Sequence, residues 1–162
     1  MPDTDQHAMR SFLFVPADSE RKLAKGPSSG PDGLILDLED SVATDRKKIA
    51  RDMVLAYLKS ANRSAPKLYV RVNALDTGLT LGDLAVVMQG KPDGIVFPKC
   101  VGQADLDRLA LWLDAFEARE GIEIDSTRIL TIATESAAAV LALSASPARH
   151  VRLMGHSWAA RT

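Results

Sequence analysis

The sequence predicts an α/β protein with a parallel β-sheet, and three features of the 162-residue chain point to this fold class. Short runs rich in β-branched and aromatic residues alternate with longer segments of helical periodicity. Several of these runs are almost continuously apolar, as parallel strands covered by helices must be. Charged residues gather directly after the apolar runs. We therefore expect repeated β–α–β units with right-handed crossovers.

Local signals divide the first half of the chain into alternating strands and helices. Pro16 stops the first strand, and Gly26 with Pro27 ends the first helix. Thr44 is expected to be the N-cap of the next helix, in which apolar residues recur every four positions. The predicted elements are strand 12–15, helix 19–25, strand 34–40, a helix from Thr44 that contains Ile49, Met53 and Tyr57, strand 68–72 and helix 81–89.

The second half continues the same alternation. Pro98 stops the fourth strand, and a long helix follows it with one apolar face. The predicted elements are strand 94–97, a helix that contains Leu106, Leu109, Leu113 and Phe116, strand 129–133, helix 137–143 and strand 151–154. The chain therefore supplies about six β/α units.

Two parallel architectures fit these units, a doubly wound open sheet and a closed barrel. The first predicts a glycine-rich turn after the first strand, but residues 15–19 read Val-Pro-Ala-Asp-Ser. A (β/α)8 TIM barrel needs eight units and about 250 residues. The expected fold is thus a TIM-barrel type with about six units, over residues 11–162, after a disordered or extended segment over residues 1–10.

Composition excludes several classes of partner. A net charge of −1 provides no basic surface for nucleic acid or membranes, and the polar first ten residues lack the apolar run of a signal peptide. No apolar run is long enough to span a membrane. Cys100 is the only cysteine, so no internal disulfide can form, and a cytoplasmic location is expected.

The carboxyl ends of the predicted strands carry a set of polar residues. In either architecture these ends meet at one edge of the sheet, where ligands bind. Carboxylates that face a lone arginine suit a divalent cation together with a carboxylated substrate. The set is Asp18, Asp37, Glu39, Asp40, Arg71, Asn73, Lys99, Thr134 and Glu135.

Five segments in this order resemble the citrate lyase β-subunit and HpcH/HpaI aldolase family. They cover the chain from Arg10 to about Ala160: RSFLFVPAD at 10–18, LDLEDSV at 36–42, YVRVN at 69–73, GIVFPK at 94–99 and ATES at 133–136. The resemblance implies a Mg²⁺-dependent carbon–carbon lyase that cleaves a 3-hydroxyacyl-CoA or a related hydroxy acid. It also implies a small-molecule substrate. An incomplete barrel leaves its first and sixth strands as unpaired edges, so a homo-oligomer is expected.

The resemblance assigns roles to individual residues. Arg71 would bind the substrate carboxylate or keto group, and Glu135 would bind both Mg²⁺ and substrate. Phe14 and Lys25 match positions that contact the thioester portion. The carboxylates of Asp37 and Asp40, with Glu39, would order water around the metal and orient Arg71.

Other polar residues also have a structural interpretation. Glu39 and Asp40 can cap the following loop, Lys25 can stabilise a helix C-terminus, and Lys99 can be a solvated loop residue. Cys100, His150 and His156 are read as structural.

Two departures from the family pattern weaken the functional assignment. Ser19 stands where the family has an arginine, so thioester binding would depend on Arg21. Arg161 and Thr162 occupy the Glu-Asp positions of a Gly-Ala-Glu-Asp motif whose aspartate is the second metal ligand. The alternative hypothesis is therefore a truncated, non-catalytic partial barrel. An open-sheet nucleotide-binding module is a third, weaker hypothesis.

Overall fold

A six-stranded, entirely parallel sheet forms the centre of the computed structural model, which describes residues 9–132, 141 and 149–157. The strands lie side by side in the order in which they occur in the chain. Every crossover therefore moves in one direction, as in a barrel, whereas a doubly wound sheet reverses its order at a switch point. The fold is thus of the predicted TIM-barrel type, and the barrel is not closed. The strands are β1 Phe12–Pro16, β2 Gly33–Asp37, β3 Lys67–Arg71, β4 Gly94–Phe97, β5 Arg128–Ile132 and β6 Leu153–Ser157.

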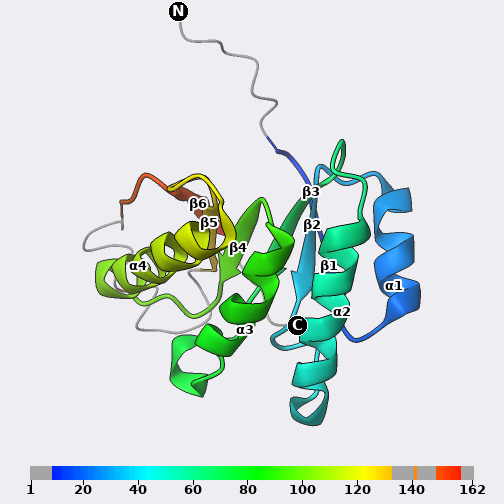
Figure 1. Ribbon diagram of the computed structural model, residues 1–162, viewed down its shortest axis with the longest axis horizontal. Helices are drawn as coiled ribbons and strands as arrows, with labels where there is room; N and C mark the ends of the chain where they lie inside the picture. The colour runs from blue at the N-terminus through cyan, green and yellow to red at the C-terminus, as the bar shows by residue number, and fades with distance from the viewer. Residues whose placement is uncertain (1–8, 133–140, 142–148, 158–162) are drawn as a thin grey trace, which may run out of the picture.

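The helices of the described residues cover one side of the sheet (Figure 1). They are α1 Glu20–Lys25, α2 Lys47–Ser60, α3 Thr80–Val87 and α4 Gln103–Glu120, with short 3-10 turns η1 Gly26–Ser29, η2 Thr44–Arg46, η3 Leu75–Thr77 and η4 Met88–Gly90. Thr44 is not the N-cap that we expected, because it begins η2 and α2 starts at Lys47. The predicted helix 137–143 lies outside the described residues apart from Leu141, as does most of the predicted segment 1–10. No described helix is long and apolar enough to cross a membrane.

Residues alternate between the two sides of each strand, which divides the apolar core in two. The larger cluster lies between sheet and helices and includes Leu36, Val70, Ile95 and Ile129. The smaller cluster lies on the inner side of the sheet and is formed by Ile35, Tyr69, Val96 and Ile132. Residues two positions after Ile35 and Tyr69 therefore also face inward, at the carboxyl ends of their strands.

A buried ion cluster joins α4 to the start of β6. Arg152 is fully buried and donates to both carboxylate oxygens of Glu117, at 2.7 and 2.6 Å, and to Asp114. β6 begins at Leu153 rather than at residue 151, because His150 accepts a turn hydrogen bond from the Leu153 backbone N–H. Arg152 is thus buried on the helix side of the sheet, and the carboxylates of Glu117 and Asp114 compensate its charge.

Gly94 provides the space in which Tyr69 packs. A Cβ atom on Gly94 would lie 2.5 Å from Cε1 of Tyr69 and 2.7 Å from the backbone oxygen of Arg128. Gly94→Ala is therefore expected to lower the free energy of unfolding by about 1–3 kcal/mol, measured by urea denaturation. Gly102→Ala is the control, since a Cβ there has no neighbour within 4 Å. Equal stability of the two variants would contradict this expectation.

Candidate active site at the carboxyl ends of the strands

Arg71 and Asp37 form a buried, two-point ion pair on the inner side of the sheet. Their Cα atoms are direct partners in the β2–β3 register, so the two side chains lie next to each other. Nε and Nη2 of Arg71 donate to the two carboxylate oxygens of Asp37, each at 2.7 Å. Asp37 is fully buried and Arg71 is 8% exposed. This geometry fixes the plane of the guanidinium and leaves Nη1 facing away from Asp37.

Three further side chains surround the guanidinium of Arg71. The ring of Phe14 lies 4.8 Å from Cζ of Arg71, in cation–π contact. Nη1 of Arg71 lies 3.2 Å from Oε2 of Glu39, and Oε1 of Glu39 lies 2.9 Å from Nζ of Lys99. The carboxyl ends of β2, β3 and β4 and the middle of β1 thus contribute to one site, which suits the binding of an anion.

The site's loops are held by buried polar contacts. Lys47 donates to the backbone oxygens of Leu38 and Glu39, each at 2.7 Å. Asp83 of α3, fully buried, accepts from the backbone N–H and the side-chain amide of Asn73, both at 2.7 Å. These contacts fix the segments that follow β2 and β3, and no sequence pattern predicts the roles of Lys47 and Asp83.

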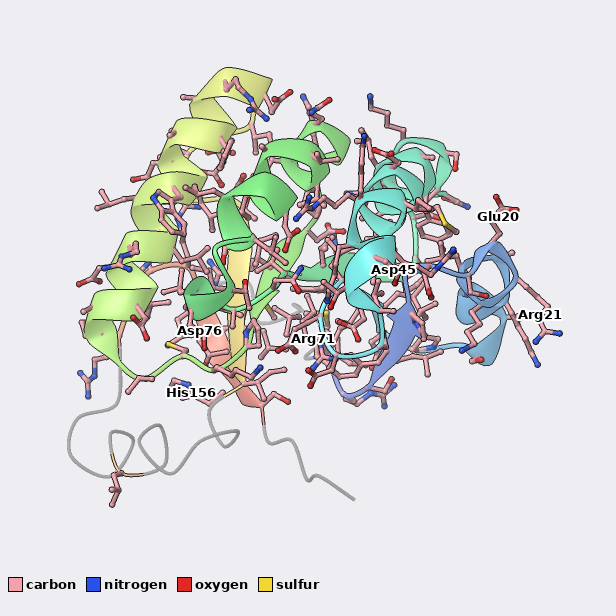
Figure 2. All side chains as sticks on the ribbon, turned by 90° about the horizontal axis from the view of Figure 1, so that it is seen from below. Glu20, Arg21, Asp45, Arg71, Asp76 and His156 are labelled. Carbon is pink, nitrogen blue, oxygen red and sulfur yellow. The ribbon has the colours of Figure 1, made fainter. Side chains whose placement is uncertain are left out.

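The structure brings two of the predicted thioester-binding residues together. Phe14 and Lys25 both line a shallow pocket of ≈ 160 Å³, and Lys22 lines it as well. Arg21 is not among its lining residues. Figure 2 shows Arg21 at the periphery, pointing outward and far from the labelled Arg71. Of the lysines and arginine on α1, Lys22 and Lys25 therefore line this pocket, and Arg21 does not.

The other predicted residues lie in different settings. Asp40 is exposed, and Asp18 pairs with Arg46 at 3.1 Å rather than with Arg71. Nδ1 of His156 lies 2.6 Å from Oγ1 of Thr131, its register partner on β5. Glu135, Thr134, Arg161 and Thr162 lie outside the described residues.

The described residues do not by themselves supply three clustered ligands for a metal ion. Within them, no group of three His, Cys, Asp or Glu side chains could hold one. The buried carboxylates of Asp37 and Glu39 face Arg71 and Lys99 rather than an open position. Mg²⁺ often takes only one or two protein carboxylates and completes its shell with water and substrate. The described residues are therefore compatible with a neighbouring Mg²⁺ without being its direct ligands.

The Asp37–Arg71 pair makes stability depend on pH. Burial raises the pKa of Asp37, but the hydrogen bonds and charge of Arg71 outweigh it and lower the pKa below its ordinary value of 3.8. The ionised form thus contributes stability that is present above pH 3.8 and is lost as the pH falls through the lower, folded-state pKa. The stability difference between wild type and Asp37→Asn should shrink as the pH drops below this range, in urea denaturation at neutral and acidic pH. A difference that grows on acidification would contradict this assignment.

Comparison with known proteins places this geometry in a family. The family described as HpcH/HpaI aldolase/citrate lyase matches residues 10–151, which is most of the chain. The chain belongs to this family. The ion pair of Arg71 and Asp37 lies inside the matched region.

Relatives within the HpcH/HpaI aldolase/citrate lyase family act on acyl-CoA substrates, according to their names. A (3S)-malyl-CoA thioesterase from Cereibacter sphaeroides is 38% identical over 104 residues, which are 64% of this chain and 36% of the relative. The human mitochondrial citramalyl-CoA lyase is 35% identical over 92 residues, 56% of this chain and 27% of the relative. The match thus spans about a third of these relatives' length.

A solved structure supports the same assignment. The CitE protein of Mycobacterium tuberculosis, in complex with magnesium and pyruvate, is 26% identical with a TM-score of 0.66. The alignment covers 93% of this chain and 54% of that chain.

Proposed function

We propose that this chain carries the substrate-binding part of a Mg²⁺-dependent carbon–carbon lyase that cleaves a 3-hydroxyacyl-CoA of the malyl-CoA or citramalyl-CoA type. The observation that supports it most is the buried guanidinium of Arg71, fixed by Asp37 and Phe14 where parallel strands end. The family and the relatives' acyl-CoA substrates favour this chemistry over other uses of an anion site.

The cleavage is a balanced retro-aldol or retro-Claisen type of step. The proton of the 3-hydroxyl group leaves, the C2–C3 bond breaks, and its electrons form an enolate on the thioester fragment. That enolate then takes up a proton, so malyl-CoA would give glyoxylate and acetyl-CoA, and citramalyl-CoA would give pyruvate and acetyl-CoA. Negative charge moves between oxygens during this step, so preorganised positive charge lowers the barrier.

Each residue of the proposed site has a distinct task. Arg71 binds the carboxylate of the departing oxo acid, and Asp37 holds the guanidinium in its binding orientation. Phe14 covers one face of the Arg71 guanidinium. Lys22 and Lys25 line the pocket beside Phe14 and bind the phosphates of coenzyme A there. Asp40 is exposed in the loop after β2 and orders water around the metal. Glu135 would hold Mg²⁺, which supplies charge that stabilises the developing oxyanion.

A second candidate activity is hydrolysis of the thioester. It is favoured by the name of the Cereibacter sphaeroides relative, which is a thioesterase. Water would attack the thioester carbonyl, and malyl-CoA would give malate and free coenzyme A. The two activities therefore differ in their products.

Product analysis tests the proposal. The purified chain is incubated with (3S)-malyl-CoA or citramalyl-CoA, with Mg²⁺ or with EDTA, and products are separated by chromatography. Acetyl-CoA formed only with Mg²⁺ supports the lyase, and free coenzyme A with malate supports hydrolysis. No product from either thioester would instead favour the non-catalytic partial barrel.

The free edges of the sheet favour a homo-oligomer, which we propose as part of this function. β1 and β6 each pair with only one neighbour among the described strands, and unpaired edges promote association. Light scattering after size exclusion should therefore show a mass above 17.5 kDa. A monomer over the whole concentration range would refute the oligomer.

A further inference from the structure

Lys99 occupies an unusual backbone position directly after β4. Its φ is 52°, in the left-handed region that residues with a side chain rarely adopt. Its side chain is only 33% exposed, and its Nζ lies 2.9 Å from Oε1 of Glu39. Uncommon backbone conformations of this kind concentrate at functional sites. The left-handed turn brings the ammonium group back over the ends of the strands.

Lys99 is one of the two cations that lie within ion-pair distance of the Glu39 carboxylate. Its side chain is 5% exposed, and among the described residues neither carboxylate oxygen accepts a hydrogen bond of good geometry. Each oxygen instead lies within ion-pair distance of one cation, Oε2 near Arg71 and Oε1 near Lys99. A buried carboxylate that is held mainly by charge responds strongly to the loss of either cation.

The four charged groups alternate along the strand ends. They run Asp37, Arg71, Glu39, Lys99, and each ion pair in this order joins a carboxylate to a cation. The ammonium group of Lys47 also lies near these carboxylates, but it donates to the backbone oxygens of Leu38 and Glu39. Without Lys99, Oε1 of Glu39 would lose this cation, and the charge of Glu39 would act mainly on Arg71. The positive potential that Arg71 offers to an incoming anion would then be largely cancelled.

We propose that Lys99 is a positioning residue for the anion site of Arg71. It takes up part of the charge of Glu39, so Arg71 keeps enough positive potential to bind a substrate carboxylate. This inference rests on the proposed function in assuming that Arg71 binds the oxo-acid part of the substrate. The role of Lys99 is indirect, because it acts through Glu39.

Binding of pyruvate to a set of charge variants tests the inference. Lys99→Met should weaken pyruvate binding about tenfold, and Glu39→Gln should bind at least as tightly as wild type. The double variant Lys99→Met/Glu39→Gln restores the balance of charge and should return to within about threefold of wild type. Lys99→Arg should retain binding. Dissociation constants are measured by calorimetry, with and without Mg²⁺.

Lys91→Met is the matched control. Lys91 lies before β4, at its opposite end, is exposed, and has the same left-handed backbone with φ of 50°. The Lys91→Met substitution removes one positive charge at the same backbone conformation but far from the strand ends that form the site. Pyruvate binding should therefore not change. Thermal unfolding of all variants reports whether each is folded. A loss of affinity in Lys99→Met that Glu39→Gln fails to restore would overturn the proposal, as would an effect of equal size in Lys91→Met.

A second readout separates this inference from the proposed function. The Nε–H group of Arg71 donates to Asp37 at 2.7 Å, so its exchange with water should be slow enough for ¹⁵N NMR. If wild type binds no pyruvate, the proposed function fails, but the role of Lys99 can still be tested. Lys99→Met should shift this resonance and Lys91→Met should not. An unchanged resonance in Lys99→Met would overturn the positioning role.

Discussion

Replacing Arg71 by methionine is expected to remove pyruvate binding and to lower any thioester cleavage by at least about a hundredfold. Methionine keeps much of the side-chain volume but provides neither the charge nor the two-point contact with Asp37. A cation that holds the substrate carboxylate orients the bond that breaks, and a misplacement of the substrate by about 1 Å can lower the rate on the order of a hundredfold. Calorimetry and product analysis measure the two effects.

The same substitution should also destabilise the fold, and the two effects must be separated. Asp37 and Glu39 would remain buried without their shared cation, which costs about 3–5 kcal/mol. Arg71→Lys keeps the charge but loses the planar fork, so it should be more stable than Arg71→Met and still bind pyruvate poorly. Arg63→Met, in the loop before the same strand, is the control for loss of a positive charge and should leave pyruvate binding unchanged. Wild-type pyruvate affinity in folded Arg71→Met would refute the assigned role.

Replacing Arg152 by methionine is expected to lower the free energy of unfolding as much as replacing Arg71 does. Burial lowers the pKa of Arg152, but the hydrogen bonds and charges of Glu117 and Asp114 outweigh it and raise the pKa, so the group stays charged. Its loss leaves the fully buried Glu117 without a cation and should cost about 3–5 kcal/mol in urea denaturation. Arg108→Met, at an exposed position of α4, should change stability by less than about 0.5 kcal/mol.

The double variant Arg152→Met/Glu117→Gln shows whether the penalty comes from the unpaired charge. It removes the buried carboxylate together with its cation, so it should recover part of the lost stability. A double variant less stable than Arg152→Met would show that packing, and not charge, dominates this cluster. A small effect of Arg152→Met itself would mean that water reaches Glu117.

The fold could be predicted from the sequence because its signals are local. Apolar runs that end at Pro16 and Pro98 mark strands, and the last residues of β2 and β3, Asp37 and Arg71, meet at one edge in any parallel sheet. The predicted strand 151–154 begins two residues before β6, because Val151 belongs to an apolar run in the sequence but is exposed in a turn.

Most of the contacts within the site could not be predicted, because they depend on register and on backbone conformation. The family resemblance implies that Asp37 orients Arg71, but the residue pattern alone does not give the β2–β3 register that brings the two side chains together. The sequence places Lys99 in the polar set at the strand ends and also allows a solvated loop residue, and neither interpretation names Glu39 as its partner. Arg152 finds Glu117 thirty-five positions earlier in the chain, a contact that only packing of α4 against the sheet creates.

A crystal structure of the chain with Mg²⁺ and pyruvate tests the central claim most directly. The expected result is pyruvate density with its carboxylate within hydrogen-bond distance of Arg71, above the ends of β2 and β3. Pyruvate bound elsewhere, or an empty site at saturating pyruvate, would contradict the claim that these strand ends form an oxo-acid site.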